Sequence, residues 1–152
     1  MRTWPLSSLA VLGLLSLSPV VYADGCALSI DANDAMQYSV KHLEVPASCT
    51  DVTLTLHHIG KLPVKAMGHN WVLTRKADAA AVASAGAAAG AAKEYLPSGD
   101  ARVIAATKLI GGGESASVTF STAALKASED YSYFCSFPGH ASMMKGPLTL
   151  AK

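Results

Sequence analysis

The chain has 152 residues, 12 basic and 11 acidic side chains, and 51% hydrophobic residues. This length suits one domain with a real hydrophobic core and is too short for two domains of ordinary size. The nearly balanced charge gives no net field that would attract nucleic acid or an anionic membrane surface, so neither is expected as a partner.

The first 23 residues have the pattern of a secretory signal peptide. Arg2 precedes an apolar run from Leu9 to Leu17, and the small residue Ala23 suits cleavage before Asp24. The apolar run is too short to span a bilayer, which argues against an anchoring helix. We therefore expect a signal peptide over 1–23 and an exported chain of residues 24–152 that is not inserted in the membrane. Since Arg2 is the charged residue lost, 11 basic and 11 acidic groups remain.

Three cysteines remain after cleavage, namely Cys26, Cys49 and Cys135. In an oxidising compartment this number indicates one disulfide and one thiol kept for another purpose. Cys26 and Cys49 are the expected pair, because they flank the first hairpin-like region while Cys135 lies among possible metal donors. The alternative, in which Cys135 joins a disulfide and one of the other two cysteines stays free, remains open at this point.

Several stretches alternate apolar and polar residues, as strands with one face in a core do. They are 52–57, 116–120, 131–137 and 148–150. Turn signals separate them at 60–63, 96–100, 111–113 and 145–147. Short connections of this kind predict an all-β fold, a Greek-key β-sandwich or barrel, that occupies residues 24–152 as one domain.

One alanine-rich segment, residues 77–92, breaks this pattern and predicts a short helical flap. Asp78 is a candidate N-cap for the helix. The segment has no stripe of Leu or Ile, so we expect the helix to bury little and to be the least stable ordered element. It also lacks the length and the bulky apolar residues of a membrane span.

The stretch from Cys135 to Met144 contains a thiol, the imidazole of His140 and a thioether, which are three soft or borderline metal donors. A second imidazole, that of His69, lies far upstream. Two His, one Cys and a weakly held Met are the donor set of an electron-transferring copper site. Asn70, directly after His69, is placed to hydrogen-bond to the Cys135 loop and hold the two ligand segments together. One copper ion, cycling between Cu(I) and Cu(II), is thus the predicted cofactor.

With these motifs the sequence resembles the azurins, the bacterial blue copper proteins of the cupredoxin family, over essentially all of residues 24–152. The likeness rests on Gly68–Trp71, Arg102–Ala105, Thr107–Gly111 and Phe134–His140. It implies a cupredoxin-like fold in which His69, Cys135 and His140 bind copper in a plane. It also implies that Met144 and the carbonyl oxygen of Gly68 are weak axial ligands, and that Cys26 and Cys49 form the disulfide.

The resemblance further implies a periplasmic type 1 copper electron carrier that is not an enzyme. As such it would be a monomer and a transient partner of c-type cytochromes, with a terminal reductase as a further candidate. In this family the second ligand His, here His140, reaches through an apolar surface patch that serves as the electron port. Ala87 and Ala106 replace residues that are commonly Met and His, so partner docking is not predicted from the family.

His58 matches a family His near the copper whose titration is linked to redox behaviour. Ile59 follows it where Pro is usual. The adjoining turn is therefore less constrained, and the sequence does not predict how the redox behaviour depends on pH.

Three other functions are compatible with some of these residues. A structural zinc module usually has four strong donors with paired close spacings, whereas the fourth donor here is a thioether. A cysteine hydrolase using Cys135 and His140 would need an orienting residue and oxyanion donors in a cleft, and two residues on one tight loop are a poor nucleophile pair. Copper storage or delivery without electron transfer stays open, because a copper site alone does not demonstrate redox function.

Overall fold

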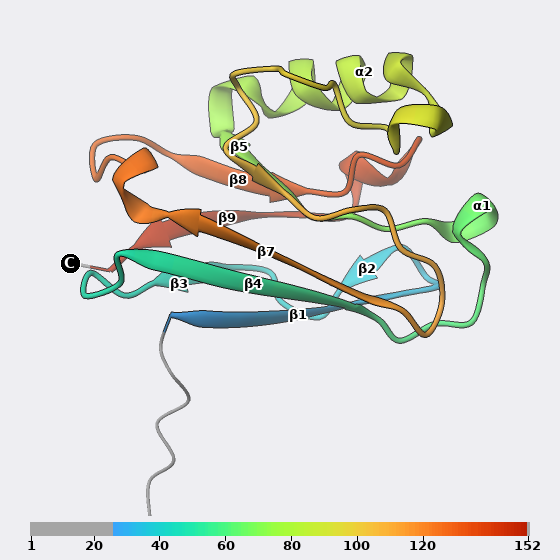
Figure 1. Ribbon diagram of the computed structural model, residues 1–152, viewed down its shortest axis with the longest axis horizontal. Coiled ribbons are helices and arrows are strands. Elements are labelled where there is room, and N and C mark those ends of the chain that lie inside the picture. Colours follow the sequence, from blue (N-terminus) through green and yellow to red (C-terminus); the bar gives the residue numbers. More distant parts are fainter. Residues whose placement is uncertain (1–25, 152) are drawn as a thin grey trace, which may run out of the picture.

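The computed structural model describes residues 26–151, so the predicted signal peptide and its cleavage point lie outside the described residues. Two β-sheets pack face to face, and a helix lies against the outer face of one of them (Figure 1). The first sheet has the order β2 (Gln37–Tyr38), β1 (Ala27–Asn33), β4 (Asp51–His58) and β7 (Ser115–Ser121). The second has the order β3 (Leu43–Val45), β9 (Lys145–Leu150), β8 (Tyr131–Phe134), β5 (Val72–Arg75) and β6 (Ala105–Ala106).

Within the described residues, five of the eight connections between consecutive strands pass from one sheet to the other. Most neighbours within a sheet are therefore distant in sequence, such as β4 beside β7 and β3 beside β9. The pairs β1–β4 and β3–β9 are parallel, and the other pairs are antiparallel. The predicted all-β fold with two packed sheets is confirmed.

The main core fills the space between the sheets. Strand β4 alternates as its sequence predicts, with Val52, Leu54 and Leu56 fully buried between exposed or half-buried neighbours. Trp71 lies at the centre, also fully buried, and its ring stacks on those of Phe120 and Tyr133. This packing provides a rigid base under the loops at one end of the sandwich.

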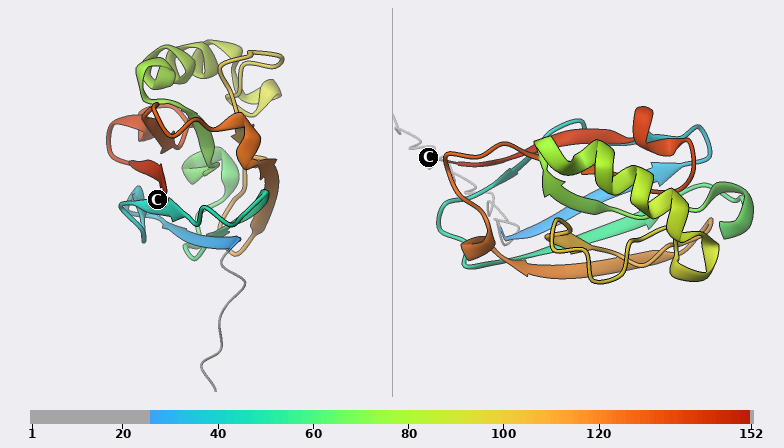
Figure 2. Two further views of the ribbon diagram at one scale, coloured as in Figure 1. Left: turned by 90° about the vertical axis from the view of Figure 1, so that its left-hand side faces the viewer. Right: turned by 90° about the horizontal axis from the view of Figure 1, so that it is seen from above.

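Helix α2 (Ala79–Ala89) confirms the predicted helix and follows the 3-10 turn η1 (Lys76–Asp78). It lies across the outer face of the second sheet (Figure 2). There Val82 packs with Val72 and Phe134 in a second apolar cluster. Asp78 occupies the predicted N-cap position, but its side chain makes no capping hydrogen bond and its backbone is already helical at the end of the preceding turn. Strands β5 and β8 are covered by the main core on one face and by α2 on the other. They therefore bury residues that an alternating pattern would place on the solvent side.

The segment Lys145–Pro147 was expected to be a turn, and this expectation is wrong because the residues begin strand β9. Gly146 pairs with Tyr133, and a side chain at Gly146 would collide with the Tyr133 hydroxyl. Pro147 precedes Leu148, the first residue of β9 that pairs with β3, and a proline is tolerated at such a position. Gly146 here permits close packing against Tyr133, and Pro147 stands just before the part of β9 that pairs with β3.

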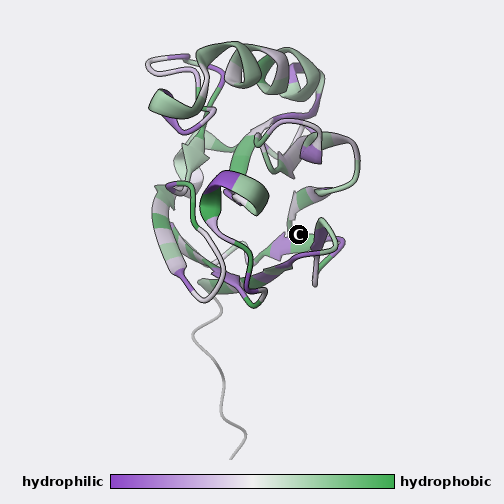
Figure 3. Ribbon diagram, turned by 90° about the vertical axis from the view of Figure 1, so that its right-hand side faces the viewer, coloured by the Kyte–Doolittle hydropathy of each residue, from purple (hydrophilic) through white to green (hydrophobic). Residues whose placement is uncertain are grey.

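Several short helical turns complete the chain. They are α1 (Val64–Met67), η2 (Ala91–Lys93), η3 (Thr122–Ala124) and η4 (His140–Ser142). Helix α1 directly follows the predicted turn at 60–63 and was not itself predicted. Figure 3 looks onto the end of the sandwich where α1 lies, with α2 above it.

A disulfide joins Cys26 and Cys49, with 5.6 Å between their Cα atoms. The predicted pairing is confirmed, and Cys135 is a buried free thiol. The bond ties together the starting ends of β1 and β4, which run parallel as neighbours. Among residues 26–151, no helix has the length and apolar character needed to cross a membrane.

Candidate metal centre

Two segments bring the predicted donors to one end of the sandwich. His69 lies between α1 and β5, and its backbone forms a two-bond bridge with Ile110. Cys135 directly follows β8, whereas His140 opens the 3-10 turn η4 after Gly139, whose φ of 82° favours glycine. The connection between β8 and β9, residues 135–144, therefore carries most of the site. We call it the copper loop.

The three side chains converge in the interior. The Sγ atom of Cys135 lies 3.9 Å from Nδ1 of His69 and 3.6 Å from Nδ1 of His140. The three donor atoms lie within 4.8 Å of one another, and all three residues are buried. In the described part of the chain no other His, Cys, Asp or Glu joins this group. Two imidazoles and one thiol around a common point fit one copper ion, and the missing fourth strong donor argues against a structural zinc site.

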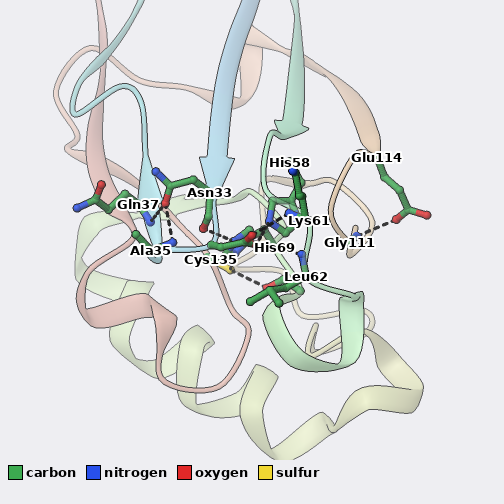
Figure 4. Close-up of polar contacts among 12 residues, drawn as sticks. Asn33, Ala35, Gln37, His58, Lys61, Leu62, His69, Gly111, Glu114 and Cys135 are labelled. Carbon is green, nitrogen blue, oxygen red and sulfur yellow. Dashed lines mark hydrogen bonds and ion pairs between the residues drawn. The ribbon is translucent and has the colours of Figure 1, made fainter.

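A backbone carbonyl fixes the tautomer of His69. Its Nε2 lies 3.0 Å from the carbonyl oxygen of Asn33, which only accepts, so Nε2 carries the hydrogen (Figure 4). Nδ1 then has its lone pair free and directed toward the Cys135 sulfur. Hydrogen bonding to the outer nitrogen orients a metal-binding His in this way.

Burial controls the charge of all three donors. It lowers the pKa of His69 to about 4, and it also lowers the pKa of His140, with a further contribution from nearby His58. Burial raises the pKa of the Cys135 thiol to about 11. At neutral pH both imidazoles are therefore neutral and ready to bind a cation, and one thiol proton remains to be released on binding.

Asn70 ties the two ligand segments together. Its Oδ1 accepts from the backbone N–H of Ser136 at 2.8 Å, and its Nδ2 donates to the Ser136 hydroxyl at 2.8 Å. The hydroxyl of Tyr38 donates to the Asn70 carbonyl from the core side. All three residues are buried. The cross-link expected from the sequence is present as two direct hydrogen bonds.

The two residues that supply weaker donors according to the resemblance, Met144 and Gly68, both contact Cys135. Met144 is fully buried, and its carbonyl accepts from the Cys135 N–H at 3.0 Å. Met143 is 53% exposed and points to the surface. The Gly68 carbonyl oxygen is 3.9 Å from the Cys135 sulfur.

Sequence reasoning missed several polar contacts that support the site. The Asn33 carbonyl and the Tyr38 hydroxyl both lie in the β1–β2 region, far from the ligand motifs. His58, which the resemblance placed near the copper, is buried edge-on to His69, with 4.4 Å between the ring centroids. The contact that was missed joins its Nε2 to Asp34 at 3.2 Å. A carbonyl oxygen has no signature in residue type, so no sequence signal indicated the Asn33 contact.

The copper-free protein is expected to lose stability as the pH falls from 6.5 to 4. In this window His69 takes up a proton when unfolded but resists it when folded, so acid favours the unfolded chain. Thermal denaturation of the copper-free protein across this range measures the effect, and His69→Gln is expected to reduce the slope. Equal slopes for wild type and variant would show that His69 is not the group responsible.

A two-sheet β-sandwich with buried His, Cys and His at one end defines a copper-binding protein of the cupredoxin type. A family model described as copper binding proteins, plastocyanin/azurin family, matches residues 24–151. The chain belongs to this family.

Individual relatives agree with this assignment. The azurin of Achromobacter denitrificans is 52% identical over 145 residues, covering 95% of this chain and 97% of the relative. Azurin-2 of Alcaligenes xylosoxydans xylosoxydans is 56% identical over 125 residues, covering 82% and 97%. Among solved structures, an azurin of the obligate methylotroph Methylomonas sp. strain J superposes with a TM-score of 0.81 at 49% identity. That match covers 84% of this chain and 98% of the other.

Proposed function

We propose that this protein is an exported blue copper electron carrier that holds one copper ion between His69, Cys135 and His140. Met144 and the Gly68 carbonyl oxygen would serve as further, weaker donors. The bound ion would supply reversible one-electron chemistry between Cu(I) and Cu(II), for which thiolate and thioether sulfur suit the reduced state and imidazole the oxidised state. The observation that carries the proposal is the preformed, buried convergence of two neutral imidazoles and one thiol.

The rigidity of the site supports a carrier. His69 is held by the Ile110 bridge and the Asn33 carbonyl, and the copper loop is held by Asn70. Electron transfer is fast when ligands move little between oxidation states, and a packed β-scaffold resists such movement. A copper store would instead benefit from an open site that exchanges metal readily.

The surface around His140 supports brief contacts with redox partners. Pro138, Gly139 and Met143 are exposed there, with Phe137 and Ala141 half-buried among them. A small apolar surface permits docking without long residence, and the balanced charge of residues 24–152 leaves steering modest. We propose c-type cytochromes as transient partners, with a terminal reductase as a further candidate, and a monomeric carrier that catalyses no reaction of its own.

We further propose that residues 1–23 direct export to the periplasm and are then removed. The expected product in a periplasmic extract begins at Asp24, and intact-mass measurement of the purified protein checks this. A chain that keeps its first 23 residues, or that stays in the cytoplasm, would contradict the proposed localisation.

Rapid electron exchange distinguishes the carrier from a copper storage or delivery protein. We expect the reduced copper protein, mixed with an oxidised c-type cytochrome in a stopped-flow instrument, to reduce the haem while keeping its copper. A chelator assay on the same sample measures metal loss. A copper form that is redox-inert but readily gives its metal to the chelator would exclude the carrier function and support storage.

A further inference from the structure

Helix α2 lies beside the copper loop. Its residues Ala79 and Ala83 belong to the same apolar cluster as Ala141 of the loop, and Gly86 lies near Ser136. Gly86 is buried on the inner side of the helix, and a Cβ atom there would collide with the carbonyl oxygen of Tyr95. The same Cβ would lie 3.5 Å from the Cβ of Ser136, which follows Cys135 directly. The helix therefore lies against both segments, and its approach to the Tyr95 carbonyl is so close that only glycine fits there.

The segment after the helix holds an unusual backbone. Gly90 ends α2 with a φ of 76°, and both Glu94 and Tyr95 have φ of 54°. Two consecutive non-glycine residues in the left-handed region are costly and persist only where the surroundings hold them. We call residues 90–95 the flap turn. It lies where the chain turns back from α2 toward the sandwich (Figure 1).

Several hydrogen bonds hold the flap turn in this conformation. The Tyr95 N–H donates to the Gly90 carbonyl at 3.0 Å, and the Glu94 carboxylate accepts from the Leu109 N–H at 3.2 Å. The Asn70 side chain also points toward the turn, with 3.5 Å between its Nδ2 and the Glu94 carbonyl oxygen. The turn is thus linked to the His69 segment through Asn70, and to the segment that pairs with His69 through Leu109.

The strained conformation directs the Tyr95 ring at the copper loop. Its edge meets the ring of Phe137 at a centroid distance of 5.1 Å and an interplanar angle of 71°. Phe137 in turn lies 4.6 Å from the His140 ring, and a Cβ at Gly68 would be 2.9 Å from its Cδ2 atom. Tyr95, Phe137 and His140 therefore form a continuous chain of ring contacts from the flap to a metal ligand.

We propose that Tyr95 is a positioning residue for His140 and that α2, through Gly86, is the clamp that holds it in place. The Tyr95 ring presses Phe137 toward Gly68 and so restricts the His140 ring. This inference rests on the metal site of the proposed function. The proposal gives the alanine-rich helix α2 a structural role, because its small side chains allow it to lie close to the copper loop.

Hydrogen exchange in the copper-free protein tests this role without depending on copper. The His140 N–H donates to the Phe137 carbonyl at 3.0 Å, so its exchange rate reports opening of the copper loop. Tyr95→Ala is expected to speed this exchange roughly five- to tenfold, the loss typical of one aromatic pair. Tyr95→Phe keeps the ring and is expected to match the wild type.

The helix contact has its own matched pair of variants. Gly86→Ala is expected to displace the flap turn and speed exchange at His140, whereas Ala88→Gly, on the exposed side of the same helix, is expected not to. The Thr53 N–H, which donates to the Cys26 carbonyl at the disulfide, serves as an internal reference for global opening. With Cu(II) added, Tyr95→Ala and Gly86→Ala are also expected to shift the visible spectrum.

Two results would overturn the inference. One is wild-type exchange at His140 in both Tyr95→Ala and Gly86→Ala, and the other is equal acceleration at His140 and Thr53. Should Tyr95→Ala fail to fold, Gly86→Ala and Tyr95→Leu make the same comparison. If the wild type takes up no copper while the exchange results hold, the proposed function fails and the mechanical link between Tyr95 and His140 stands.

Discussion

Cys135→Ser is expected to abolish the intense visible band that the wild-type protein develops with Cu(II). The band would arise from charge transfer between a thiolate and copper, and a serine hydroxyl is a hard donor that stays protonated at neutral pH. Copper affinity is expected to fall by more than about 100-fold, because loss of an outer hydrogen-bond partner alone costs about 10- to 100-fold. Titration with Cu(II), followed by absorbance, measures both effects.

The neighbouring residue Met143 provides the control for this experiment. Met143→Ala removes an exposed thioether beside the site and is expected to keep the wild-type band. Far-UV circular dichroism should show the same β-fold in both variants, since serine closely matches cysteine in shape. A wild-type protein that remains colourless with Cu(II) would contradict the copper proposal and favour a zinc or hydrolytic role.

The donor residues of this site could be identified from the sequence because their chemistry is rare. A thiol and an imidazole five residues apart, with a second imidazole upstream, suit few functions apart from metal binding. Their spatial convergence could not be derived from spacing alone. His69 reaches Cys135 because its segment pairs with Ile110, a contact between residues far apart in the chain.

The fold was predictable where one face of a strand is buried and the other exposed, as in β4. The pattern fails where α2 covers the second sheet, because Val72 and Phe134 are buried on the side away from the main core. It also fails at Gly146, which reads as a turn residue. The reason is tertiary, since Tyr133 occupies the space that a side chain at Gly146 would need.

The supporting contacts of the site were the least predictable part. Asn33 contributes its backbone carbonyl, which every residue has, and the flap turn positions Tyr95 through two left-handed residues that are neither Gly nor Asn. Sequence rules for positive φ rely on glycine and asparagine and therefore miss Glu94 and Tyr95. Asn70 was the exception, because its place beside His69 indicated its role.

Asn70→Ala is expected to destabilise the copper-free protein by about 3 kcal/mol. The change leaves the buried N–H and hydroxyl of Ser136 without partners, and each unsatisfied buried group costs about 1–3 kcal/mol. Urea unfolding of the copper-free form measures the loss as a lower midpoint. Copper affinity is expected to fall as well, because the two ligand segments are no longer joined through this side chain.

Ser136→Ala is the matched variant, because it removes one of the two hydrogen bonds and leaves the Ser136 N–H bonded to Asn70. Its expected cost is about 1 kcal/mol. The double variant should lose less stability than the sum of the two single-variant losses, since the residues share one buried network. Strict additivity, or a loss for Asn70→Ala no larger than for Ser136→Ala, would mean that Asn70 does not link the His69 segment to the copper loop.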